Sequence, residues 1–133
     1  MKDFDQTRFA VISDIHSNSA ALEAVLQDIS DQGIESIVNL GDHLSGPMAA
    51  RETAELLLAH EMLSIRGNHD RWLVENKRED MNSIDGVAFD QLQERHLEWL
   101  RGLPSTLWLS ENVFACHGTP RALLHKSLRG FTV

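Results

Sequence analysis

The sequence has a single cysteine, Cys116, so it contains no second cysteine with which an internal disulfide could form. It has no apolar run near the roughly 18 residues that a membrane-spanning helix requires. The first residues carry acids ahead of a short apolar run and lack the basic-then-apolar order of a secretory signal. These absences lead us to expect a cytoplasmic protein without a membrane partner.

Positive charge is also scarce, because 12 lysines and arginines are outnumbered by 20 acidic residues, which gives a formal charge of −8. A protein that coats nucleic acid normally carries a basic face, so the charge balance argues against that class. A small phosphate-bearing molecule is still a suitable partner, because clustered carboxylates hold cations and the cations attract phosphate. The length of 133 residues predicts one domain over residues 1–133.

Short apolar runs alternate with segments of helical spacing over the first half of the chain. The runs "RFAVIS", "SIVNL" and "EMLSI" predict strands at residues 8–13, 36–40 and 61–65. Between them, apolar residues recur at helical spacing over residues 19–33 and 47–60. This order is typical of a parallel sheet covered by helices, so the predicted fold class is α/β.

The second half of the chain has less regular patterning. We expect a turn or two of helix at residues 70–80, a loop at 81–86, and one amphipathic helix at 87–103 that Pro104 ends. The stretch "STLWLSENVFACHG", residues 105–118, predicts two short strands around a polar turn.

Polar clusters rich in metal ligands follow the predicted strands. They are "DIH" at residues 14–16, "GDH" at 41–43, "GNHD" at 67–70 and "ACHG" at 115–118. Because the carboxyl ends of parallel strands meet at one edge of a sheet, we expect the clusters to converge. Asp, His and Asn bind Mn, Fe or Zn, and one carboxylate can bridge two metals. Each cluster alone is compatible with an ordinary polar turn, but their joint placement predicts a metal site.

The segments "SDIHSNSAALEAVL", "GDHLSGP", "RGNHD" and "FACHGTP" resemble the successive motifs of the calcineurin-like metallophosphoesterases, over roughly residues 9–120. The compact bacterial and archaeal phosphodiesterase-type members are the most similar. The resemblance implies a layered α/β sandwich whose first sheet and flanking helices are largely present and whose second sheet is incomplete. It also implies hydrolysis of phosphate diesters or monoesters by a water activated between two metals.

The resemblance implies a role for each residue at a matching position. Asp14 and His16 would hold the first metal, Asn68 and His117 the second, and Asp42 would bridge both. The two metals would be divalent, with Mn²⁺ expected first and Fe, Zn, Ni or Co as alternatives.

Further residues would act on the substrate. His69 would face the phosphate, to stabilise developing charge or to protonate the leaving oxygen, and Asp70 would orient its imidazole. Asn18, His43 and Arg66 are weaker candidates for substrate contact. Helix capping is the preferred role for Asn18, and a loop position at the surface is the preferred role for His43. Surface positions are also expected for the three histidines outside the clusters, namely His60, His96 and His125.

One element of the family pattern has no counterpart here, a Gly-His-x-His stretch after the "HG" motif whose histidines complete the two metal shells. After "HGTP" the sequence reads "RALLHKSLRGFTV". We therefore expect a partial domain that is truncated before that motif, with metal shells short of ligands and one or two ions bound. An exposed apolar face should favour a homo-oligomer. The alternative to an active hydrolase is a non-catalytic remnant that keeps the fold and part of the metal binding.

Overall fold

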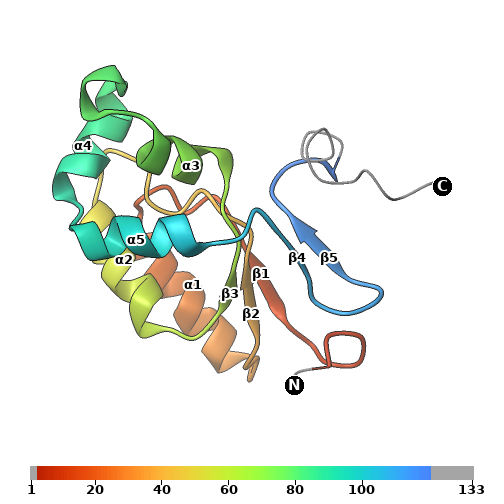
Figure 1. The fold of residues 1–133 in the computed structure, drawn as a ribbon. Coiled ribbons are helices and arrows are strands. Elements are labelled where there is room, and N and C mark those ends of the chain that lie inside the picture. The colour runs from red at the N-terminus through yellow and green to blue at the C-terminus, as the bar shows by residue number, and fades with distance from the viewer. Residues whose placement is uncertain (1–2, 121–133) are drawn as a thin grey trace, which may run out of the picture.

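The computed structural model describes residues 3–120 and has a parallel sheet at its centre (Figure 1). The sheet contains β1 (Ala10–Ile12), β2 (Ile37–Asn39) and β3 (Leu63–Ser64), hydrogen-bonded in that order. All neighbouring strands are parallel, which confirms the predicted α/β class. Each strand is shorter than the apolar run that predicts it, and the polar clusters begin where the strands end.

Two helices connect the strands and cover one face of the sheet (Figure 1). They are α1 (Ser19–Asp31) and α2 (Ala50–Ala59). The side chain of Asn18 caps α1 by accepting a hydrogen bond from the N–H of Ala21 at 3.0 Å, as preferred for this residue. The core on this face includes Leu22, Leu26, Leu44, Ala54 and Leu57. Over residues 3–120, no helix is both long enough and apolar enough to cross a membrane.

Residues 68–102 form three short helices and a single 3₁₀ turn. These are α3 (Asn68–Glu75), η1 (Arg78–Asp80), α4 (Ser83–Gln91) and α5 (Glu94–Gly102). The prediction of a loop at residues 81–86 is therefore wrong, because α4 begins inside it.

The prediction of a single helix over residues 87–103 is also wrong. The chain is extended at Leu92, with ψ at 147°, and a new helix starts after Gln93. The N–H of Gln93 donates to Nδ1 of His96 at 2.9 Å, so the histidine caps α5. His96 is fully buried, which corrects the prediction that it lies on the surface. The helical spacing of apolar residues continues across the boundary between α4 and α5, so the sequence pattern does not indicate that boundary. His125 lies outside the described residues.

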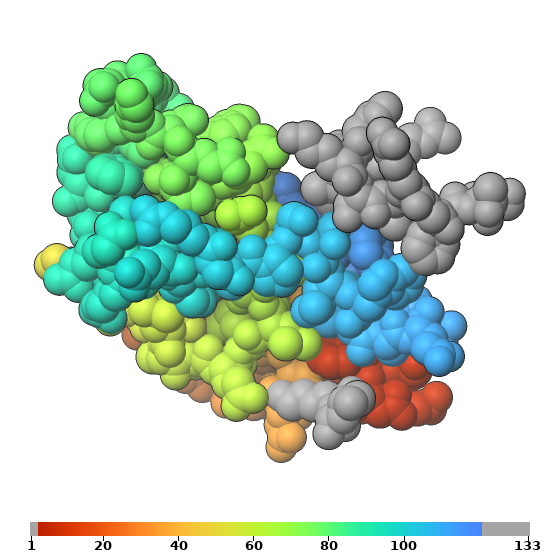
Figure 2. Space-filling view, in the orientation of Figure 1, coloured from red at the N-terminus to blue at the C-terminus, as the bar shows by residue number. Residues whose placement is uncertain are grey.

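A β-hairpin covers the opposite face of the central sheet (Figure 1). Its strands β4 (Thr106–Trp108) and β5 (Phe114–Cys116) are antiparallel, as predicted. Figure 2 shows the hairpin against the N-terminal segment, on the far side from α4. A second core cluster joins the two sheets and includes Phe4, Phe9, Val38, Leu107 and Ala115. Helices, central sheet and two-stranded sheet together form the predicted layered architecture.

Candidate metal centre

Backbone hydrogen bonds join the loops that follow β1 and β2. The N–H of Asp14 donates to the carbonyl of Gly41, and the N–H of His16 donates to the carbonyl of Asp42, both at 3.0 Å. In the loop after β1, Asp14, His16 and Ser17 have positive φ values of 55°, 46° and 59°, and Asp42 in the loop after β2 has 58°. Few residues other than glycine adopt this conformation, and such backbone gathers at functional sites.

Two glycines allow the loops after β2 and β3 to touch. Gly41 has a φ of +108°, and a Cβ on it would lie 2.4 Å from the backbone nitrogen of Gly67. A Cβ on Gly67 would lie 2.2 Å from Oδ1 of Asp42. Any side chain at either position would therefore push the two loops apart.

Asp42 lies at the centre of the converging clusters and is only 3% exposed. Its Oδ1 accepts a hydrogen bond from the N–H of His69 at 3.0 Å. Its Oδ2 lies 3.6 Å from Nε2 of His16 and 3.4 Å from Nε2 of His117. One carboxylate oxygen therefore lies between two imidazoles that come from opposite ends of the chain.

Backbone carbonyls set the orientation of both imidazoles. Nδ1 of His16 donates to the carbonyl of Ser45 at 2.7 Å, and Nδ1 of His117 donates to the carbonyl of Leu40 at 2.9 Å. Because a carbonyl oxygen only accepts, the ring proton of each neutral histidine lies on Nδ1. Each Nε2 then points a lone pair at Asp42. Metal-binding histidines commonly have this second hydrogen bond.

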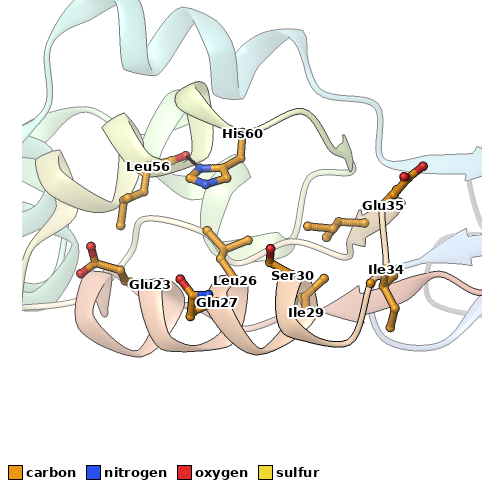
Figure 3. A pocket seen from close by; sticks show the side chains of 11 residues that line it. Glu23, Leu26, Gln27, Ile29, Ser30, Ile34, Glu35, Leu56 and His60 are labelled. Atoms are coloured by element: carbon orange, nitrogen blue, oxygen red, sulfur yellow. Dashed lines mark hydrogen bonds between the residues drawn. The ribbon is translucent and has the colours of Figure 1, made fainter.

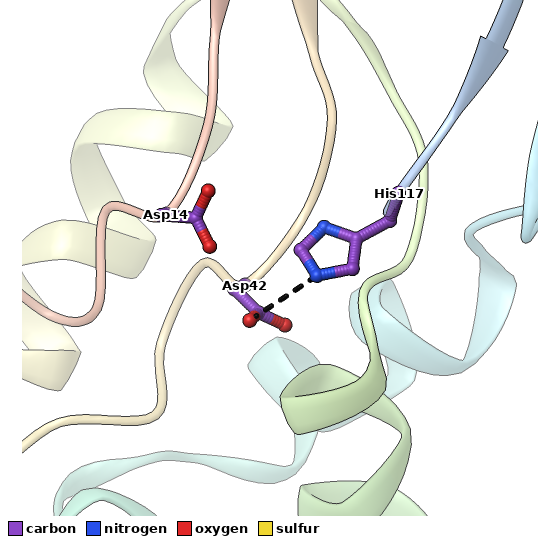
Figure 4. Close-up of side chains that lie close together, drawn as sticks. All are labelled: Asp14, Asp42 and His117. Carbon is purple, nitrogen blue, oxygen red and sulfur yellow. Dashed lines mark ion pairs between the residues drawn. The ribbon is translucent and has the colours of Figure 1, made fainter. Parts of the chain in front are cut away.

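Several nitrogen and oxygen atoms therefore direct lone pairs at one another, with no hydrogen-bonding proton between them. Nε2 of His117 lies 3.1 Å from Oδ1 of Asn68, in addition to its approach to Asp42. Asp14, Asp42 and His117 each place one ligand atom within 4.8 Å of the others, and Figure 4 shows the three side chains pointing together. The chemistry of this donor set fits a divalent cation, because a cation would relieve the repulsion between the lone pairs.

The five predicted metal ligands are thus brought together at one end of the sheet. Asp14 and His16 lie on one side of Asp42, with Oδ1 of Asp14 at 3.8 Å from Nε2 of His16. Asn68 and His117 lie on the other side. Potential ligands therefore surround the carboxylate of Asp42.

Asp70 has a different place from the one predicted. It is fully buried, and its carboxylate accepts hydrogen bonds from three backbone N–H groups, those of Asp42 at 2.7 Å, His43 at 2.8 Å and Gly67 at 2.8 Å. None of these three hydrogen bonds involves the ring of His69. The prediction that Asp70 orients that imidazole is therefore wrong. Asp70 instead joins the two loops that present Asp42 and Asn68.

His43 also departs from its prediction. It is fully buried, and its Nε2 donates to the carbonyl of Ile65 at 2.9 Å while its ring packs on Trp99. Neither a substrate contact nor a surface loop position is compatible with this burial. Nδ1 of His43 has no hydrogen-bond partner within the part of the chain that the structure describes.

His69 is half-buried at the edge of the centre. Its ring packs edge-on against Trp72 and His16, with centroids 4.6 Å and 5.2 Å away. Its Nδ1 lies 3.4 Å from Oγ of Ser45. Ser45 is a site residue that the sequence analysis did not identify. The motif "GDHLSGP" gives no indication that its serine contacts both His16 and His69. Arg66 is half-buried, and its contact with substrate stays a prediction.

The structure also has an open cavity of about 590 Å³ between α1 and the end of α2 (Figure 3). Glu23, Leu26 and His60 are among its lining residues. None of the converging ligands lines it, so the cavity is separate from the candidate metal centre.

Comparison with known proteins gives consistent matches. The family model for calcineurin-like phosphoesterases matches residues 7–131. An uncharacterized protein of Methanocaldococcus jannaschii is 36% identical over 113 residues, which cover 81% of this chain and 46% of that protein. The crystal structure of a metallophosphoesterase from Sphaerobacter thermophilus is similar with a TM-score of 0.68 and 33% identity, over 85% of this chain and 47% of that one. The chain spans about half the length of these relatives.

Proposed function

This chain belongs to the calcineurin-like phosphoesterase family, and on that premise we propose that it hydrolyses small phosphate esters with the help of divalent metal ions. One observation supports the proposal most directly. Oδ2 of Asp42 lies between the Nε2 atoms of His16 and His117, and both rings are fixed by backbone carbonyls. This is the arrangement expected of a carboxylate that bridges two cations.

The ligands divide into two sets around the shared carboxylate. Asp14 and His16 would hold one ion, Asn68 and His117 the other, and Asp42 both. Mixed oxygen and imidazole donors suit Mn²⁺, with Fe, Zn, Ni and Co as alternatives. When bound, the ions would lower the pKa of a water and offset the negative charge of the phosphate.

His69 is the proposed residue that acts on the substrate. Its ring lies beside His16 and is half-buried, so one edge can meet a phosphate held at the metal centre. A nitrogen of this ring would donate a hydrogen bond to a phosphate oxygen or to the leaving oxygen. Arg66, at the end of β3, is a further proposed contact for an anionic ester.

The test is metal binding together with hydrolysis, using the full 133-residue chain. Mn²⁺ binding is measured by titration calorimetry, and turnover is measured with bis(p-nitrophenyl) phosphate and p-nitrophenyl phosphate. We expect Asp42→Asn to weaken binding of both ions and to abolish turnover. Asp31→Asn is the matched control, because this exposed aspartate lies at the end of α1 and its side chain hydrogen-bonds only Gln27 within residues 3–120. Unchanged binding and turnover in Asp42→Asn would contradict the proposal.

A second candidate function is metal binding without turnover. It is favoured by the cluster of Asp14, Asp42 and His117, whose ligand atoms lie close enough together to hold one ion. The same experiment separates the candidates, because Mn²⁺ bound at Asp42 without hydrolysis of either ester would support this second function.

A further inference from the structure

Ser45 connects the metal centre to helix α4 through two hydrogen bonds. Its carbonyl accepts from Nδ1 of His16 at 2.7 Å, and its hydroxyl donates to Oδ1 of Asp85 at 2.5 Å. Ser45 and Asp85 are buried, with 2% and 3% of their surfaces exposed. One residue therefore links a proposed metal ligand to a buried carboxylate of α4 that the proposed hydrolysis does not use.

The ring of His16 depends on this link for its orientation. The side chain is 39% exposed, so the surrounding residues do not enclose it. Within residues 3–120, Ser45 makes the only hydrogen bond to the ring, and His69 contacts it edge-on. The direction of the Ser45 carbonyl therefore decides where Nε2 of His16 points.

The Ser45 carbonyl lies in a stretch of chain that regular structure does not hold. Over residues 3–120, no backbone–backbone hydrogen bond involves residues 44–47. A peptide plane in such a stretch is free to turn unless a side chain holds its residue in place. The hydrogen bond from the Ser45 hydroxyl to Asp85 provides this hold, and bonds to a carboxylate are stronger than bonds between neutral groups.

Asp85 is itself held in place by Asn82, the cap of α4. Oδ1 of Asn82 accepts the N–H of Asp85, and Nδ2 of Asn82 donates to Oδ2 of Asp85, both at 2.8 Å. Each carboxylate oxygen of Asp85 therefore has its own donor, Ser45 for Oδ1 and Asn82 for Oδ2. These contacts prevent the carboxylate from turning away from Ser45.

We propose that Asp85 and Ser45 are positioning residues that hold the ring of His16 with Nε2 turned to Asp42. Asp85 fixes the Ser45 hydroxyl, and the carbonyl of the same residue then fixes the ring. The consequence for metal binding rests on the proposed function, whereas the orientation of the ring does not.

His117 has no need of such support and provides an internal comparison. Nδ1 of its ring donates to the carbonyl of Leu40 at 2.9 Å. The N–H of Leu40 in turn donates to the carbonyl of Ile12 on β1 at 2.9 Å, so this residue is held by the sheet itself. Changes at Asp85 should therefore affect the ring of His16 and not the ring of His117.

The first measurement is ¹³C relaxation of the histidine Cε1–H groups, which reports on fast motion of each ring. It uses the metal-free chain at about pH 8.5, where an ordinary imidazole is neutral. The His16 signal is identified by its loss in His16→Gln. We expect an ordered His16 ring in the native chain and a mobile one in Asp85→Ala and Ser45→Ala, which break the same hydrogen bond from opposite sides. The His117 ring should stay ordered in both variants.

Asp85→Asn separates the hydrogen bond from packing. Turning the Asn82 amide would lose the cap of α4, so the new oxygen faces Asn82 and the new NH₂ donates to Oγ of Ser45. This variant should keep the His16 ring ordered, unlike Asp85→Ala. Asp90→Ala is the matched control, because it truncates an exposed carboxylate on the same helix, and it should also leave the ring ordered.

The second measurement is Mn²⁺ binding by titration calorimetry, in chains that keep one ion position. Asp85→Ala added to His117→Gln should raise the Kd of the ion on the His16 side on the order of tenfold to a hundredfold. Added to His16→Gln, the same change should leave the Kd of the other ion unaltered, because the ring through which Asp85 acts is absent.

The two measurements have different outcomes that would overturn the proposal. One is a His16 ring that is as ordered in both alanine variants as in the native chain. The other is an equal loss of Mn²⁺ affinity when Asp85→Ala is added to His117→Gln and to His16→Gln, which would indicate a general structural effect. If the native chain binds no Mn²⁺, the proposed function fails, and the relaxation measurement still decides whether Asp85 positions the ring.

Discussion

Oδ2 of Asp70 accepts a hydrogen bond from the backbone N–H of Asp42 at 2.7 Å, so the first turn of α3 sets the position of the proposed bridging carboxylate. The same oxygen accepts from Gly67, and the other oxygen accepts from His43. Hydrogen bonds to an ionised carboxylate are stronger than neutral ones. The buried charge is stabilised in this way, and two loops from distant parts of the sequence are held in one arrangement.

Asp70→Asn should therefore destabilise the fold and weaken metal binding together. The new NH₂ group would meet one backbone N–H in the place of Oδ1 or two in the place of Oδ2, which leaves buried donors without acceptors. We expect a loss of roughly 2–4 kcal/mol in the free energy of unfolding, measured by urea denaturation of the metal-free chain. Asp31→Asn serves again as the control. Equal stability of Asp70→Asn and the native chain would show that these bonds do not hold the loops.

The two histidines beside Asp42 allow the two proposed ion positions to be tested separately. His16→Gln removes a ligand on the side of Asp14, and His117→Gln removes one on the side of Asn68. Each change should reduce Mn²⁺ binding from two ions to one per chain, measured by titration calorimetry. His60→Gln, at the distant cavity, should leave binding unchanged. If neither site variant changes the stoichiometry, the division into two ligand sets is wrong.

The convergence of the ligand-rich clusters could be predicted from the sequence because their positions follow directly from the topology of the sheet. Three strands in parallel order place "DIH", "GDH" and "GNHD" at the same edge of the sheet, whatever the details of the helices. Asp14, Asp42 and His117 accordingly lie within 4.8 Å of one another although they are far apart in the chain. An apolar run that ends in a polar cluster is therefore enough to predict that the cluster lies at this edge of the sheet.

The orientation of the supporting residues could not be read in the same way. Burial of His43 and His96 depends on carbonyl and carboxylate partners that the sequence does not identify, since polar residues in loops are usually exposed. Asp70 and Asp85 have similar local sequence contexts to surface aspartates, and each has a hydrogen-bond partner that lies 27 or more residues away. Packing of α3 and α4 against the loops decides these contacts.

Glu55 should make the stability of the chain depend on pH in the acid range. Its carboxylate accepts a hydrogen bond from Nε2 of His96 at 2.8 Å and pairs with Arg95, which joins α2 to α5. The hydrogen bond from His96, followed by that from Arg95, lowers the pKa of Glu55 below its ordinary value of 4.5. A lowered pKa means that the contribution is fully present above pH 4.5 and is lost as the pH falls through the folded-state pKa.

The measurement compares the native chain with Glu55→Gln by urea denaturation at pH values from neutral to about 3. The native chain should be the more stable at neutral pH, and the difference should shrink below pH 4.5. Glu52→Gln changes an exposed glutamate on the same helix and should show no such pH dependence. A difference for Glu55→Gln that stays constant with pH would contradict this account.

Large apolar side chains are exposed on strands of both sheets, and we predict that they cause the chain to self-associate. Trp108 on β4 is 55% exposed and packs against Phe114, and Val11 is 54% exposed on β1, an edge strand of the central sheet. Open strand edges and exposed apolar patches favour association with a further chain. Size-exclusion chromatography with light scattering should therefore show a concentration-dependent mass above that of the monomer.

Trp108→Ser and Val11→Thr should each lower that mass, because they remove apolar surface without changing a buried residue. Leu58→Ser is the matched control, since Leu58 is 41% exposed on α2, away from the strands. An equal effect of all three variants would indicate nonspecific aggregation. A native chain that stays monomeric at every concentration would contradict the prediction, because exposed Trp108 and Val11 would then be compatible with a stable isolated chain.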